Sequence, residues 1–125
     1  MACLDTNVII DYINGNEKVR ELVDAYAKNE GITTTIITKY ELLIGRDEVE
    51  RQIIRSFLND IKVYPLEDKA AEVAANIRRK LKLSGSLIRD SDILIAGIST
   101  VNDETLITQD RDFERIKSGR FVIIK

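Results

Sequence analysis

Residues 1–13 read MACLDTNVIIDYI and set one acidic residue, Asp5, between two apolar stretches. The pattern predicts a buried strand over residues 2–5 that leads directly into a helix over residues 6–15. An ionised carboxylate removed from water costs free energy unless it is hydrogen-bonded or binds a metal. Asp5 therefore needs a partner, and two interpretations remain open at this point: a helix N-cap or a metal ligand.

The composition indicates a single globular domain over residues 1–125. Hydrophobic residues make up 44% of the chain and charged residues 32%, which is typical of folded proteins. No apolar run approaches the roughly 20 residues of a membrane span, and the N-terminus lacks the pattern of an export signal. The only cysteine is Cys3, so no internal disulfide can form, and we expect a cytoplasmic protein.

Charge and histidine content exclude several classes of function. The net charge of −2 argues against a protein that coats nucleic acid through bulk positive charge. The chain has no histidine, which excludes Ser-His-Asp and Cys-His nucleophiles and any histidine-ligated zinc. Any chemistry must therefore depend on carboxylates, hydroxyls, lysines or arginines.

Predicted strands and helices alternate along the rest of the chain. We expect helices at residues 17–29, 38–45, 47–60, 68–83 and 91–100, and strands at residues 32–37, 61–66, 105–108 and 121–125. Pro65 favours an edge position for the strand that contains it, because proline cannot donate a hydrogen bond to a neighbouring strand. The alternation predicts an α/β fold, an α/β/α sandwich with a mostly parallel central sheet.

Four acidic residues are expected at strand ends or helix starts. Asp5 lies at the carboxyl end of a predicted strand and Asp110 follows another, while Glu41 and Asp92 lie in the first turns of predicted helices. Ligands of open parallel sheets bind outside the carboxyl ends of the strands, so these acids are expected to meet there. Carboxylates without imidazole or thiolate suit hard cations such as Mg²⁺ or Mn²⁺, and the number of ions, one or two, stays open.

Helix capping is the alternative explanation for each acid. Glu41 fits a capping box that begins at Thr38, and the other acids are also placed to cap helices. Asp90 and Asp92 are two residues apart, so on a helix they point about 200° away from each other. Asp92 is preferred because it directly precedes the apolar run, and Asp112 is kept as a candidate for a second metal.

Four motifs together resemble one known family. They are LDTNVIID near the N-terminus, YELLIG, DILIAG and LITQDRDFERI. In combination they resemble the PIN domain ribonucleases, and most closely the VapC-type toxins of prokaryotic toxin-antitoxin pairs. The resemblance implies a Mg²⁺- or Mn²⁺-dependent endoribonuclease, a hydrolase in which a metal-bound water cleaves a phosphodiester of RNA.

The resemblance also assigns roles by position. It makes four residues the catalytic metal ligands, namely Asp5, Glu41, Asp92 and Asp110. It makes Asn7 and Thr108 polar supports of these acids. It implies a homodimer and a VapB-like antitoxin that covers the active site. The lack of a long apolar run separately predicts no membrane association.

RNA outside the cleaved bond requires positive charge. The strongest candidates precede Asp92 in the sequence and are Arg78, Arg79, Lys80, Lys82 and Arg89. A solvated helix face is the alternative explanation for this charge run. Lys39, Arg46, Arg111 and Arg115 are closer to the acids in sequence but are no stronger as candidates.

Three rival functions fit less well. A phosphoacceptor signalling domain needs an acidic pair after the first strand and a late lysine, whereas this chain has LDTN and Gln109-Asp110. A haloacid-dehalogenase-like phosphatase needs a second aspartate where Asn7 stands. A catalytically inert PIN-like module that binds RNA or protein is expected to lack one or more acids, and this chain has all four.

Overall fold

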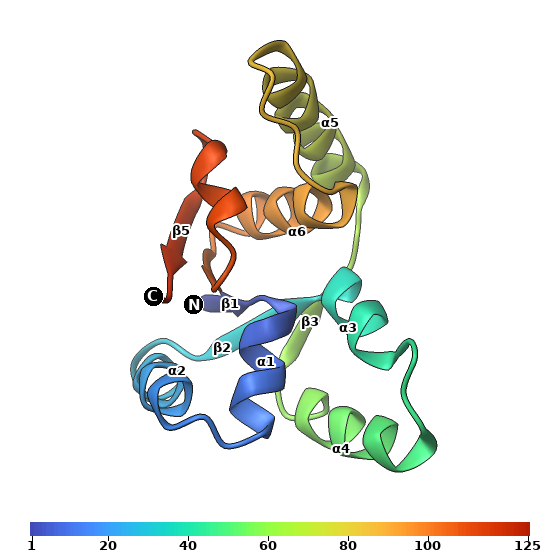
Figure 1. Cartoon of the computed structure of the whole chain (residues 1–125), viewed down its shortest axis with the longest axis vertical. Helices are drawn as coiled ribbons and strands as arrows, with labels where there is room; N and C mark the ends of the chain where they lie inside the picture. Colours follow the sequence, from blue (N-terminus) through green and yellow to red (C-terminus); the bar gives the residue numbers. More distant parts are fainter.

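The computed structural model describes residues 1–125 and has one five-stranded sheet between two layers of helices (Figure 1). The strands are β1 (Ala2–Leu4), β2 (Ile32–Thr35), β3 (Lys62–Tyr64), β4 (Thr105–Thr108) and β5 (Arg120–Ile123). Their order across the sheet is β3-β2-β1-β4-β5, and every neighbouring pair is parallel. The predicted α/β/α fold is confirmed, and the strand that precedes Pro65 lies at a sheet edge as expected.

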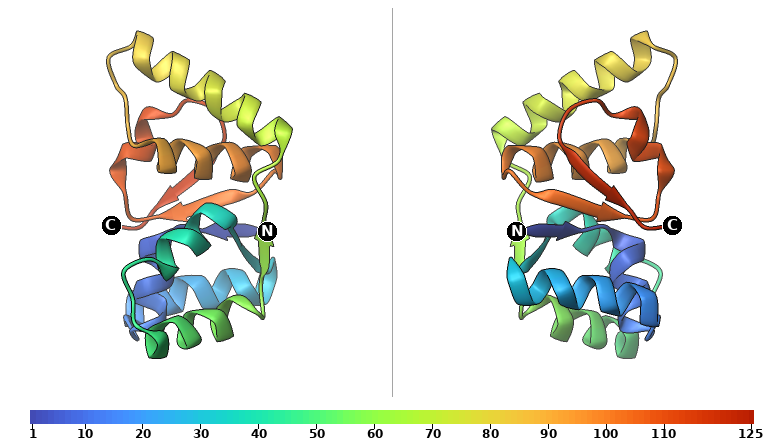
Figure 2. Two further views of the ribbon diagram at one scale, coloured as in Figure 1. Left: turned by 90° about the vertical axis from the view of Figure 1, so that its right-hand side faces the viewer. Right: turned by 90° about the vertical axis from the view of Figure 1, so that its left-hand side faces the viewer.

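Side chains of β1 alternate between two cores. Ala2 and Leu4 pack into the core on one face of the sheet, and Cys3 packs into the core on the other face. The first face is covered by α1 (Thr6–Ile13), α2 (Glu17–Asn29) and α4 (Glu48–Leu58), and the second by α5 (Asp68–Leu83) and α6 (Asp90–Val101). Figure 2 shows the strands between these two layers.

Helix α6 lies directly on the sheet, and α5 packs mainly against α6 (Figure 1). Their close approach depends on Gly97 of α6. A Cβ atom at Gly97 would lie 2.8 Å from the carbonyl oxygen of Ala70 and 2.9 Å from the Cβ of Ala74. The small residue therefore allows the backbones of α5 and α6 to approach closely.

Several boundaries differ by one or two residues from the sequence prediction, and the one between β2 and α3 bears on the site. We expected a strand through residue 37, but β2 ends at Thr35 and α3 (Ile36–Leu43) follows immediately. Thr35 is the N-cap of α3, and its hydroxyl accepts a hydrogen bond from the backbone N–H of Thr38 at 3.1 Å. The predicted capping box from Thr38 to Glu41 is therefore wrong, because Thr38 already lies inside α3. The Glu41 side chain is thus available for another contact.

The last segment between strands forms a short 3₁₀ helix, η1 (Arg111–Arg115). None of the helices is both long and apolar enough to cross a membrane.

Candidate functional site

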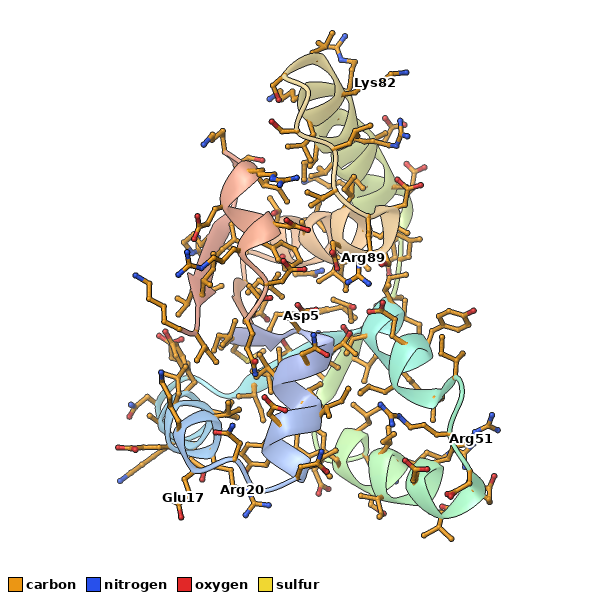
Figure 3. The ribbon with its side chains drawn as sticks, in the orientation of Figure 1. Asp5, Glu17, Arg20, Arg51, Lys82 and Arg89 are labelled. Atoms are coloured by element: carbon orange, nitrogen blue, oxygen red, sulfur yellow. The ribbon has the colours of Figure 1, made fainter.

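The carboxyl ends of the two central strands, β1 and β4, bring the candidate acids together. Asp5 directly follows β1, and Asp110 comes two residues after β4. Asp92 lies in the first turn of α6, and Glu41 lies on α3. Figure 3 shows Asp5 at the start of α1 below the start of α6, where Arg89 is labelled. All four acids therefore lie on the side of the sheet where the strands have their carboxyl ends.

Asp5 is buried, with 6% of its surface exposed, and it is the N-cap of α1, the first of the two roles considered for it. As the N-cap of α1, its Oδ1 accepts a hydrogen bond from the backbone N–H of Thr6 at 2.8 Å. Its Oδ2 accepts a hydrogen bond from the Thr108 hydroxyl at 2.7 Å. Burial raises the pKa of Asp5 despite these hydrogen bonds, and the negative charges of Glu41 and Asp110 raise it further. The hydrogen bonds that Asp5 accepts therefore do not fully offset the cost of burying its negative charge.

Glu41 is oriented by a hydroxyl group from another helix. The Thr6 hydroxyl donates a hydrogen bond to Oε1 of Glu41 at 2.7 Å and lies 3.3 Å from the hydroxyl of Thr38. Thr6 is a contact that sequence reasoning missed, although its position directly after Asp5 is a signal that could have suggested it. The hydrogen bond fixes α3 to α1 and turns Glu41 toward the other acids.

Asp92 is 2% exposed, and its carboxyl group has a strongly raised pKa. Burial raises its pKa to about 6, with additional contributions from the negative charges of Asp5 and Asp110. Arg89 opposes this effect, because its Nε and Nη2 lie 3.2 Å and 3.4 Å from the two carboxylate oxygens. Arg89 is mostly exposed, and its own pKa is raised by the hydrogen bonds to Asp92.

Asp90 points away from the site. Its carboxylate is exposed and pairs with Arg78 on α5 at 3.1 Å. The two aspartates thus separate as helix geometry requires, with Asp92 inward and Asp90 outward.

Asp110 and Asp112 complete the acidic cluster. One carboxylate oxygen from each of Asp92, Asp110 and Asp112 lies within 4.8 Å of the others. Asp110 caps η1 by accepting a hydrogen bond from the backbone N–H of Asp112 at 2.9 Å, and its own N–H donates to the Thr108 hydroxyl at 3.0 Å. Oxygen-only ligands at this spacing fit a hard divalent cation such as Mg²⁺ or Mn²⁺. These carboxylate oxygens therefore suit the Mg²⁺ or Mn²⁺ ion that the sequence motifs imply.

The other candidate residues are distributed more widely. Thr108 joins Asp5 to Asp110, whereas Asn7 is exposed and makes no side-chain hydrogen bond to Asp5. Among the basic candidates, Arg89 contacts the cluster and Arg78 pairs with Asp90. Figure 3 shows Lys82 at the end of α5 that lies far from Asp5. The basic residues of this run therefore do not form one continuous surface beside the acids.

Comparisons with known proteins agree with this geometry. The model of the PIN domain matches residues 2–119. The chain belongs to the PIN domain family. This PIN domain is 30% identical to Ribonuclease VapC5 of Mycobacterium tuberculosis, over 97% of this chain and 91% of the relative.

Two solved structures share the PIN fold seen here. VapBC2 from Rickettsia felis, bound to a DNA fragment from its promoter, superposes with a TM-score of 0.88 at 23% identity, over 99% of this chain and 98% of that one. DNA-bound VapBC from Salmonella typhimurium superposes with a TM-score of 0.87 at 26% identity, over 98% of each chain. The resemblance stated from the sequence motifs is confirmed.

Proposed function

We propose that this protein is a metal-dependent endoribonuclease, the toxin of a VapBC-type toxin-antitoxin system, built as one PIN-like nuclease domain over residues 1–125. The observation that carries the proposal is the cluster of carboxylate oxygens from Asp92, Asp110 and Asp112 beside the buried Asp5. The relationship of the chain to Ribonuclease VapC5 supports RNA as the substrate.

In this proposal five acids hold Mg²⁺ or Mn²⁺, namely Asp5, Glu41, Asp92, Asp110 and Asp112. A divalent ion supplies a bound water of lowered pKa and charge stabilisation at the phosphodiester. The hydroxyls of Thr6 and Thr108 orient Glu41 and Asp5 through hydrogen bonds of 2.7 Å each. The hydrogen bond from Thr108 favours the charged form of Asp5, which is the form that binds a cation.

Arg89 supplies positive charge beside the buried Asp92. Because the side chain of Arg89 is long and 68% exposed, it would be able to leave the carboxylate if a divalent ion were bound there. After it leaves, the guanidinium is available to a phosphate group of the RNA, for which its planar donors are suited.

The proposed partners are RNA, a VapB-like antitoxin and a second copy of the chain, in the cytoplasm. The Salmonella and Rickettsia structures are VapBC complexes, which supports an antitoxin. A small apolar hollow between α1, α3 and α4 is available to a protein partner. The residues that line it include Ile10, Ile13, Leu42, Ile53 and Ile54. Tyr40 on α3 and Ile44, which directly follows α3, are exposed.

The test is cleavage of a mixed RNA pool by purified protein with Mg²⁺, with Mn²⁺ and with EDTA. Asp92→Asn is the inactive variant, and Asp90→Asn is its matched control, because it makes the same change two residues away on an acid that points outward. We expect cleavage by the wild type and Asp90→Asn, and a loss of most activity in EDTA and in Asp92→Asn. Equal activity in all proteins, with no divalent ion bound in calorimetry, would favour an inert PIN-like binding module.

A further inference from the structure

A cleft of about 760 Å³ lies between the C-terminal half of α5 and η1, next to the acidic cluster, with which it shares only Asp112. One wall is formed by Lys80 and neighbouring residues of α5, and the other by residues 111, 112 and 114–118. Ser84 and Ser86, which follow α5, also line the cleft. In Figure 1, α5 and the short red helix η1 both rise on the same side of the sheet as α6.

The charge of the cleft differs in sign from that of the whole protein. Its lining includes four cationic residues, Lys80, Arg111, Arg115 and Lys117, and two acidic ones, Asp112 and Glu114. The net charge of the whole chain is −2. An excess of positive charge inside a concave surface of an acidic protein attracts an anion locally.

Most of these cations are free to bind a ligand. Lys80, Arg111 and Lys117 form no ion pair within the protein. Arg115 is partly engaged, since it donates to the carbonyl oxygen of Leu87 at 3.3 Å and lies 3.7 Å from Asp112. The free ammonium and guanidinium groups therefore supply the donors that phosphate oxygens need.

Asp112 joins the cleft to the proposed metal site. Its carboxylate belongs to the group of oxygens within 4.8 Å, and the same residue lines the cleft. A polymer whose cleaved bond lies at the acids can therefore continue into the cleft. The lining has three apolar residues and no aromatic one, so it offers no platform on which a base could stack.

We propose that this cleft binds the sugar-phosphate backbone of single-stranded RNA adjacent to the cleaved bond, through Lys80, Arg111 and Lys117, without reading its sequence. The inference rests on the proposed function, because it takes RNA as the substrate. It adds a substrate-binding site that shares only Asp112 with the catalytic acids. Within the run of basic residues at 78–82, only Lys80 lines the cleft, so only Lys80 is assigned this role.

The experiment compares two double variants with the same change in net charge. Lys80→Glu with Lys117→Glu reverses charge in the cleft. Lys28→Glu with Lys69→Glu is the matched control, because Lys28 is exposed on α2 and Lys69 lies near the other end of α5. Circular dichroism melts establish that both variants fold, and the probe is a fluorescein-labelled single-stranded RNA of mixed sequence. Its binding is measured by anisotropy in EDTA, and its cleavage by kcat and KM in Mg²⁺.

We expect the cleft variant to weaken RNA binding and raise KM by about tenfold or more at low salt, while kcat stays close to that of the wild type. The slope of log K against log salt is expected to become shallower by about 0.7 for each phosphate that the variant no longer neutralises. The control variant is expected to differ from the wild type by less than about threefold, because only its long-range charge has changed.

Equal losses in the two double variants, or none in either, would overturn the cleft proposal while wild-type cleavage leaves the proposed nuclease intact. Failure of the wild type to bind or cleave RNA would overturn both. If the cleft variant kept its RNA affinity but no longer bound an acidic protein partner, the cleft would be a protein-binding site and the RNA proposal would be wrong.

Discussion

Asp92 is a buried carboxylate whose charge is costly until a cation binds. Its pKa is about 6 in the folded protein and 3.8 ordinarily, mainly because of burial. The folded state therefore binds the proton more tightly than the unfolded state does, and this contribution to stability is lost as pH rises through 6.

Replacing Asp92 with asparagine is therefore expected to stabilise the metal-free protein. In EDTA at pH 7, Asp92→Asn should raise the free energy of unfolding by about 1–3 kcal/mol, and the gain should shrink as pH falls from 6 toward 4. Urea titrations at several pH values measure it, with Asp90→Asn as a control that changes stability little. A variant less stable than the wild type at pH 7 would contradict this account of Asp92.

Arg89 competes with any cation for the same carboxylate. Its guanidinium contacts both oxygens of Asp92, so a metal must displace it. Arg89→Ala is expected to tighten the binding of Mg²⁺ or Mn²⁺ by about fivefold, which corresponds to an ion pair of about 1 kcal/mol. Isothermal titration calorimetry measures the affinity, and Arg78→Ala is the matched control because its pair with Asp90 lies outside the cluster. Weaker metal binding by Arg89→Ala would mean that Arg89 supports the site instead.

At the scale of elements, the contact of α5 with α6 positions Asp92. Gly97 leaves no room for a side chain against Ala70 and Ala74. Gly97→Ala is expected to lower the free energy of unfolding by about 1–3 kcal/mol through overpacking, although alanine favours helix formation. Urea unfolding tests this, and Ala75→Ser on the exposed side of α5 should change stability by less than about 0.5 kcal/mol. Unchanged stability in Gly97→Ala would show that α5 can move away without cost.

The start of α3 marks the limit of prediction from local sequence. Residues 32–37 are rich in β-branched side chains, which favour a strand. The chain instead turns into a helix after Thr35, because that hydroxyl caps α3 and tertiary packing outweighs local preference. By contrast, the helix expected at residues 68–83 has the same bounds in the structure, because its apolar period and its stop signal agree.

At the scale of the whole molecule, a bound divalent ion is expected to stabilise the fold. An ion that binds only the folded state at 100 times its Kd adds about 2.7 kcal/mol. Thermal melts should shift upward with Mg²⁺ and return to the starting value with EDTA. Asp5→Asn should abolish the shift, while Asp60→Asn, an exposed acid, should retain it. A shift of equal size in both variants would indicate binding elsewhere.

The fold and the general place of the acids could be predicted from the sequence because both follow from the order of strands and helices. Alternating strands and helices imply a parallel sheet, and such a sheet gathers its strand ends at one edge. The sequence could not predict the contacts that depend on long-range packing. The hydrogen bond from Thr6 to Glu41 and the cleft beside η1 both join segments whose distances follow only from the folded structure.

The Thr108 hydroxyl has a consequence for how the protein is made. It joins Asp5 and Asp110, which lie near opposite ends of the chain, and β4 must pair with β1 before that contact exists. A nascent chain that has not yet released β4 from the ribosome therefore has no assembled site. If the protein is the nuclease proposed here, it cannot cleave the messenger that encodes it, or the RNA of the ribosome that makes it, until β4 has been synthesised and has paired with β1.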